Sequence, residues 1–115
     1  MSRQATPILA LTRAATGTIS AQRFVTPAGA QAGADANALG VSRVAAVSGE
    51  KLTLDCLGTA IVEAGAAVAA GASIKSDASG RAITWVTSGA RLGVALDAAG
   101  AAGEFIEVML IPNAA

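Results

Sequence analysis

The chain has no histidine and no tyrosine, a single cysteine and very few aromatic residues. Without histidine, the commonest general base that activates a serine or cysteine nucleophile is missing. The one thiol, Cys56, cannot form a disulfide within the chain, and we interpret it as a small buried apolar residue of a strand. These absences argue against a hydrolase or another enzyme that uses an activated nucleophile.

An excess of charge of either sign is also missing, since eight Lys and Arg balance eight Asp and Glu. Nucleic-acid binding needs positive charge gathered on one face, and here it is scattered. The acidic residues occur singly, and the pair Glu104 and Glu107 would point to opposite faces of one strand. We therefore expect no direct nucleic-acid contact, no metal site, no catalytic carboxylate pair and, without a phosphate-loop motif, no cofactor.

Long hydrophobic runs are absent too. No stretch approaches the ~18 apolar residues that a membrane-spanning helix needs, and the short apolar run near the N-terminus is below the length of a signal-peptide core. We expect a protein made in a cytoplasm, with no membrane partner. Hydrophobic residues make up 53% of the chain, but about a quarter of all residues are alanine. Because alanine buries little area, the core should be thin, and association would add stability.

Residues 1–17 are expected to form an extended arm ahead of a single small β domain at residues 18–115. Pro7 interrupts regular structure, and Ile8, Leu9 and Leu11 follow it closely. A disordered terminus is the alternative. The apolar residues favour an arm, or an edge strand, that lies along another surface.

The rest of the chain is typical of a mainly β protein with short strands and Gly- or Ala-rich connections. Residues 74–84 read as a hairpin, because Asp and Gly at 77–80 favour a turn. Gly58 is expected to mark a bulge or bend in a long strand pattern. In the last strand, Ile106, Val108 and Leu110 should face the core. The expected strands are 18–26, 50–57 continued by 59–63, 72–75, 81–87, 92–96 and 104–111.

The alternation within residues 50–57 predicts a strand with one wet face. Leu52, Leu54 and Cys56 lie on the apolar face. The other face carries Lys51, Thr53 and Asp55.

Two stretches of the chain repeat one pattern. The tripeptide Leu-Gly-Val at 39–41 recurs at 92–94, and Gly-Glu at 49–50 recurs at 103–104. A strand follows each Gly-Glu pair. The repeat predicts two similar β units packed into one compact barrel or sandwich, with the small residues letting neighbouring backbones approach closely.

Two bulky aromatic residues are candidate subunit contacts. Trp85 alternates with Ile83 and carries an N–H that needs a partner if it is buried. Tryptophan is also enriched at protein interfaces, so core and interface remain equal alternatives for it. Phe24 lies in a strand pattern without a clean apolar face, which is consistent with an interface position.

Taken together, three long segments resemble the small capsid cement or head decoration proteins of tailed bacteriophages. The resemblance covers nearly the whole chain and rests on the order of the motifs, because each alone is short and Ala-rich. The segments are TPILALTRAATGTISAQRFVTPAGAQAGADANALGV at 6–41, LGTAIVEAGAAVAAGASIKSDASGRAI at 57–83 and RLGVALDAAGAAGEFIEVMLIPN at 91–113.

This resemblance implies a β-tulip-like fold and a structural role in the virion. Such proteins bind the outer capsid surface, commonly as homotrimers, and clamp neighbouring subunits of the major capsid protein against internal pressure. By the resemblance, the arm residues Pro7, Ile8, Leu9, Leu11 and Arg13 would contact the capsid protein. The alternatives are a tail or baseplate component and a small ligand-binding β module, although the latter would need aromatic platforms that the chain lacks.

Overall fold

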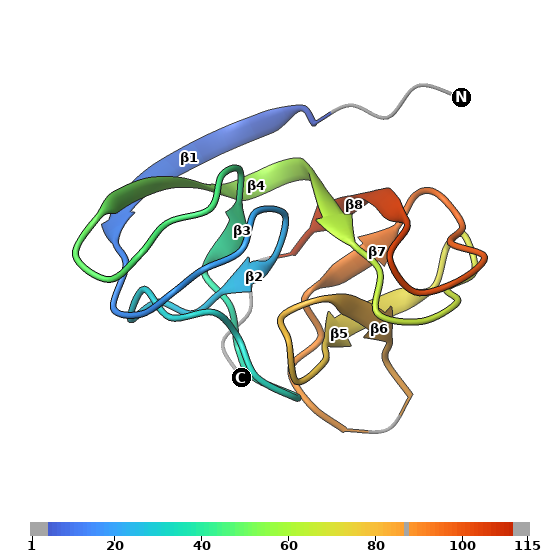
Figure 1. Ribbon diagram of the computed structural model, residues 1–115. Helices are drawn as coiled ribbons and strands as arrows, with labels where there is room; N and C mark the ends of the chain where they lie inside the picture. Colours follow the sequence, from blue (N-terminus) through green and yellow to red (C-terminus); the bar gives the residue numbers. More distant parts are fainter. Residues whose placement is uncertain (1–4, 87, 112–115) are drawn as a thin grey trace.

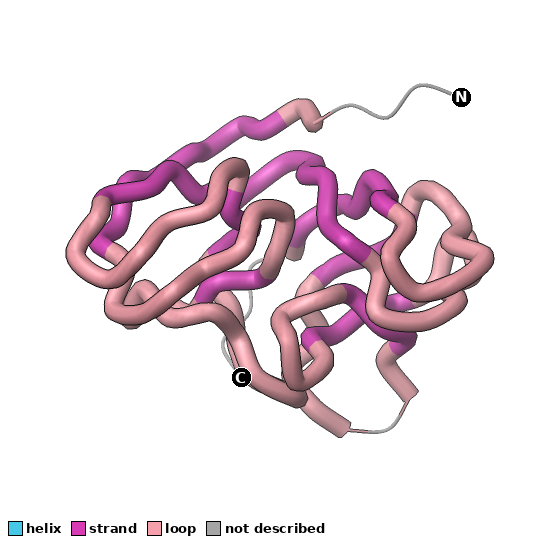
Figure 2. The backbone as a smooth tube through the Cα atoms, in the orientation of Figure 1, coloured by secondary structure: helices cyan, strands magenta, loops and turns pink. Residues whose placement is uncertain are grey.

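The computed structural model describes residues 5–86 and 88–111, which form strands and no helix. One sheet runs in the order β2-β3-β4-β8-β7-β5-β6, and β1 attaches to β4. The sheet curls into a nearly closed barrel (Figures 1 and 2), which confirms the predicted mainly β class. The strands are β1 (Pro7–Ala14), β2 (Phe24–Val25), β3 (Gly40–Ser42), β4 (Lys51–Glu63), β5 (Ser73–Ser76), β6 (Ala82–Thr84), β7 (Gly93–Ala95) and β8 (Phe105–Leu110).

In the part of the chain that the structure describes, no helix is long or apolar enough to cross a membrane.

Strand β4 is the longest and pairs with three other strands. Its first part pairs with β1 and β3, and its second part pairs with β8, all antiparallel. At the join lies Gly58, which has a φ of +91° and pairs with both Pro7 and Leu110. The register of β1 slips between Pro7 and Ala10, opposite this glycine. The expected irregularity at Gly58 is therefore present, and the strand continues through it.

The buried apolar residues form two clusters. The smaller contains Ala15, Ile19, Val25, Ala46, Leu52, Leu54 and Cys56. The larger contains the whole of the predicted core face of β8, with Ile106 and Val108 at 0% exposure and Leu110 at 8%. Alanine supplies many of its other positions, which agrees with the thin core expected from composition. Those alanines are Ala32, Ala60, Ala64, Ala82, Ala90, Ala95 and Ala99.

The same backbone contacts occur twice along the chain. Ile19 and Ala46 exchange two hydrogen bonds of 2.8 and 2.9 Å. Further along, Val68 and Ala99 exchange two hydrogen bonds of 2.9 and 2.8 Å. The pairing of β2 with β3 is likewise matched by that of β5 with β7, at the same spacings along the sequence.

These two matches define corresponding positions in the two halves of the chain. A residue between β1 and β2 has its counterpart as far along the chain as Val68 is from Ile19. A residue between β3 and the first part of β4 has its counterpart as far along the chain as Ala99 is from Ala46, within one residue. On this basis the first part of β4 corresponds to β8, and β1 corresponds to the second part of β4.

Every residue of the smaller core cluster then has a counterpart in the larger one. The pairs are Ala15 and Ala64, Ile19 and Val68, Val25 and Ile74, Ala46 and Ala99, Leu52 and Ile106, Leu54 and Val108, and Cys56 and Leu110.

Two expectations about strands need correction. Residues 18–26 do not form one strand, because a turn with Gln22 at a φ of +62° interrupts them and only Phe24–Val25 is regular. Asp55 does not lie on a wet face but is 3% exposed. Its Cα partner Val41 and the next residue in that row, Phe24, are both buried and belong to the larger core cluster, so the face that these three side chains share is turned to the interior at this point of β4.

Most of the other expected elements are found within a residue or two. The hairpin at 74–84 is confirmed by the pairing of β5 with β6, and its turn is closed by the Asp77 side chain, which accepts hydrogen bonds from two backbone N–H groups. The strand expected at 81–87 is shorter in the structure, because β6 ends at Thr84; its expected last residue, Thr87, lies outside the described residues, as do residues 1–4 of the arm.

Gly93 lets β7 approach β8 closely, because a Cβ at that position would collide with the backbone oxygen of Met109. We predict that Gly93→Ala lowers the free energy of unfolding by about 1–3 kcal/mol, the usual cost of forcing extra atoms into a packed site. Urea unfolding measures this loss. Gly17→Ala is the matched control, because a Cβ there meets no atom within 4 Å and stability should stay within about 0.5 kcal/mol. Equal stability of the two variants would contradict the explanation.

Candidate binding surface

Strand β1 runs along the outside of the molecule, beside β4 (Figure 1). Within the described chain, β4 is the only strand that pairs with it. Its side chains from Ile8 to Ala14 are all exposed, and Ile8 reaches 82%. An apolar edge strand of this kind offers unpaired backbone groups and apolar side chains to another protein. The segment that follows differs, because Ala15 is buried and joins the smaller core cluster.

Two apolar grooves border β1. On one side, Leu9 and Leu11 line a groove of about 270 Å³ together with Leu39, Cys56 and Ile111. On the other, Ile8 and Met109 line a groove of about 420 Å³. The structure thus places the predicted arm residues Ile8, Leu9 and Leu11 at the rims of two concave surfaces.

The other two predicted arm residues lie at the ends of the strand. Pro7 is half-buried at its start. Near its end, the Arg13 guanidinium donates a hydrogen bond to the Pro27 carbonyl at 3.3 Å.

Sequence reasoning did not single out three apolar residues near this surface. Met109 is 51% exposed, Phe105 is 42% exposed and Ile111 is 37% exposed. The alternation of β8 placed these residues on the face opposite the core, and that signal was sufficient to mark them as surface residues. Met109 and Ile111 line the grooves beside β1, whereas Glu107 separates Phe105 from them on the outer face of β8.

The two aromatic candidates differ in position. Phe24 is 1% exposed and belongs to the larger core cluster. The exposure expected for it is therefore not found, and its side chain offers no surface to a partner. Trp85 is half-buried, and its indole N–H donates to the Gly89 carbonyl at 3.0 Å. The N–H partner that a buried tryptophan needs is thus supplied by the adjacent loop.

Cys56 lies at the floor of the groove beside Leu11, where it is 9% exposed. Burial raises the pKa of its thiol above the ordinary value, and the nearby Asp55 carboxylate adds to this effect. A thiol with a raised pKa is a poor nucleophile at neutral pH. The interpretation of Cys56 as a buried apolar residue is consistent with this environment.

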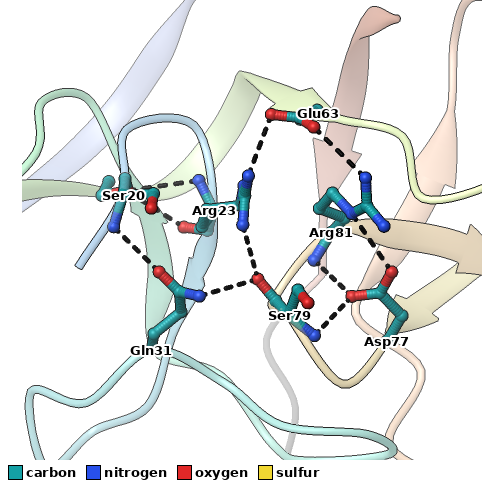
Figure 3. Close-up of polar contacts among 8 residues, drawn as sticks. Ser20, Arg23, Gln31, Glu63, Asp77, Ser79 and Arg81 are labelled. Carbon is teal, nitrogen blue, oxygen red and sulfur yellow. Dashed lines mark hydrogen bonds and ion pairs between the residues drawn. The ribbon is translucent and has the colours of Figure 1, made fainter. Parts of the chain in front are cut away.

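A polar cluster joins β2, the end of β4 and the β5–β6 turn (Figure 3). The Glu63 carboxylate lies between two guanidinium groups, at 3.1 Å from Arg23 and 3.4 Å from Arg81. Arg23 also donates to the Ser79 carbonyl at 2.9 Å, and Arg81 lies 3.4 Å from the Asp77 carboxylate. The positive and negative charges balance, so we interpret this cluster as a structural connection between the two ends of the curled sheet.

Removal of the Glu63 charge tests this interpretation. We predict that Glu63→Gln lowers the free energy of unfolding by about 1–3 kcal/mol, because two guanidinium groups with little exposure lose a charged partner. Urea unfolding is the measurement. In contrast, Asp35→Asn breaks the ion pair with Lys75, but Asp35 is 47% exposed, so its loss should cost less than about 1 kcal/mol. A smaller effect at Glu63 than at Asp35 would refute the structural role.

Among residues 5–86 and 88–111, no three metal-ligating side chains gather in one place. The polar cluster around Glu63 is engaged within the fold, while the side chains exposed along the first part of β1 are apolar. This surface is suited to binding another protein.

Comparisons with known proteins identify the family. Residues 3–110 match the phage cement protein family. No curated protein sequence matches the chain. Among solved structures, the chain is similar to the N base of the head fibre gp8.5 of bacteriophage phi29, with a TM-score of 0.73 and 17% identity over 90% of this chain and 93% of that chain. At this identity the likeness shows a shared fold. The chain belongs to the phage cement protein family, and it is a structural protein of the capsid rather than an enzyme.

Proposed function

We infer that this protein cements the capsid from outside, binding neighbouring subunits of the major capsid protein as a homotrimer after synthesis in the host cytoplasm. The observation that carries this function is the exposed apolar strand β1, whose residue Ile8 is 82% exposed. Residues 1–17 act as the contacting arm, and residues 18–115 form the domain that presents it.

Strand β1 supports this role through the way it is attached. Backbone pairing with β4 fixes its position, so its side chains are left for a partner. Ile8 lines one groove, while Leu9 and Leu11 line the other. A protein that joins two subunits has to contact both, and two apolar surfaces on either side of one strand meet that requirement. Arg13 adds a positive charge at the end of the strand.

A homotrimer strengthens weak contacts through multivalency. Three arms on one particle raise the effective concentration of the second and third after the first has bound. We assign the contacts between subunits to apolar residues away from the grooves beside β1, such as Phe105 on the outer face of β8 and the half-buried Trp85. Burial of this area would also add to the stability that a core rich in alanine provides.

A binding assay on capsids tests the role of β1. Ile8→Asp places a charge where the proposed contact is apolar, so we predict at least about tenfold weaker binding to capsids that lack the protein. Co-sedimentation measures this affinity. The control is Val44→Asp, because Val44 is 56% exposed and lies outside the grooves beside β1. Substitution is preferred to deletion of residues 1–17, which would uncover the edge of β4 and remove the core residue Ala15.

Two outcomes would count against cementing. One is equal binding by both variants and the wild type. The other is labelling of the protein on the tail or baseplate of purified particles, instead of on the head.

The assembly state is tested separately by light scattering of the purified protein. We predict the mass of a trimer for the wild type and, because β1 is assigned to the capsid contact, the same mass for Ile8→Asp. A monomer at all concentrations would show that the subunits do not preassemble. If the wild type is a trimer and Ile8→Asp is not, β1 would be assigned to the contact between subunits.

A further inference from the structure

The outer face of β8 is largely apolar although it is exposed. Its alternate side chains fill the larger core, while Phe105 and Met109 on the outer side are 42% and 51% exposed. On the neighbouring strand, Leu96 donates its backbone N–H to the Glu107 carbonyl and is also 42% exposed. An antiparallel sheet with one face in water commonly carries polar residues on that face. The composition of this face therefore indicates that another surface packs on it.

The corresponding row of the first half is already covered. There Val41 and Asp55 pair across β3 and β4, and they are 1% and 3% exposed. Their counterparts are Val94 and Met109, which pair across β7 and β8. Val94 is half-buried and Met109 is 51% exposed. The second half thus lacks a cover that the first half has, and it carries methionine where the first half carries aspartate.

The carboxylates on and beside this outer face have no cation near them. The ion pairs of the described chain include none of Asp97, Glu104 and Glu107, and residues 92–111 contain no Lys or Arg. The Asp97 carboxylate accepts a hydrogen bond from the Glu107 N–H at 3.2 Å, so it lies at the edge of β8. A partner for this face has to bring positive charge together with apolar contact.

Positive charge of this kind lies at the other end of the molecule, where β1 ends and β4 begins (Figure 1). Lys51 is exposed there and forms no ion pair with a described residue. The exposed Arg13 beside it donates to the Pro27 carbonyl instead of to a carboxylate. One carboxylate, Glu50, is also present, and it accepts a hydrogen bond from the Val47 N–H. The two ends therefore carry opposite net charge.

We propose that a second copy of this chain covers the outer face of β7 and β8, with its Lys51 opposite Glu107. The proposal rests on the homotrimer inferred above and names the surfaces that join its subunits. Leu96, Glu107 and Phe105 are the part of this face that lies outside the grooves beside β1, so those grooves stay open for the capsid protein. The stem of Lys51 can cover apolar surface while its ammonium group reaches the carboxylate.

The charges also decide how the copies are arranged. In a two-fold contact the same patch meets itself, and the three carboxylates of one copy would then face those of the other. A head-to-tail contact joins two different patches and closes into a ring when the rotation between copies allows it. Opposite charge at the two ends of one chain suits the second arrangement, and a three-fold ring is its closed form in a trimer.

Exchange of the two charges provides the test. Lys51→Glu and Glu107→Lys each place like charges opposite one another, so we expect the trimer of either variant to dissociate at a concentration at least about tenfold higher than that of the wild type. The double variant restores opposite charges, and its trimer should return to within about threefold of the wild type. Sedimentation velocity over a range of concentrations measures both effects. Lys51→Glu alone remains informative if Glu107→Lys does not fold, because Lys51 is exposed.

The matched control is Ala34→Glu, which adds a negative charge at an exposed position in the loop between β2 and β3 and should leave the trimer unchanged. Trimers of wild-type strength in Lys51→Glu, or no recovery in the double variant, would overturn the head-to-tail contact and leave the homotrimer standing. A wild type that is monomeric at all concentrations would refute the homotrimer itself. Weaker co-sedimentation of Glu107→Lys with capsids, while its trimer stays intact, would assign this face to the capsid protein and overturn the proposed occupant.

Discussion

The structure depends on one shared strand, because β4 belongs to the sheet of both halves. Its first part contributes to the smaller core, and its second part contributes to the larger one. Gly58 makes this possible, since a φ of +91° bends the chain at the join while both neighbours stay paired. A side chain at that position would meet the backbone of Thr6 and Ile8. Both the bend and the attachment of β1 therefore require glycine at position 58.

A second constraint brings the ends of the curled sheet together. The Glu63 carboxylate holds Arg23 from one half and Arg81 from the other, and Phe24 accepts a backbone hydrogen bond from Ala32 while donating one to Gly80. Most of these contacts form between residues that are far apart in the sequence. These polar and backbone contacts hold the two ends of the curled sheet together. They explain how a chain with a core of mostly small residues encloses an interior, because the few large side chains could not hold the ends together by packing alone.

Some of the fold was predictable because the signal is local. The strand through 50–63, the hairpin turn at Asp77 and the core face of β8 follow from alternation and turn chemistry. Other features depend on distant partners. The sequence alone predicts a solvated carboxylate at Asp55, yet this residue is 3% exposed and Arg43 lies 2.6 Å away. Gln22 adopts a left-handed backbone conformation, which its residue type does not predict. For the binding surface, the sequence marked the residues of β1, whereas both grooves arise only when β1 meets β4 and the end of β8.

The attachment of β1 has an evolutionary consequence. Main-chain hydrogen bonds hold this strand on β4, and such bonds are nearly independent of which side chains the strand carries. Selection can therefore exchange the exposed residues of β1 without risk to the core, as long as Gly58 keeps its conformation. A protein built this way can follow a changing partner surface while its buried core stays the same.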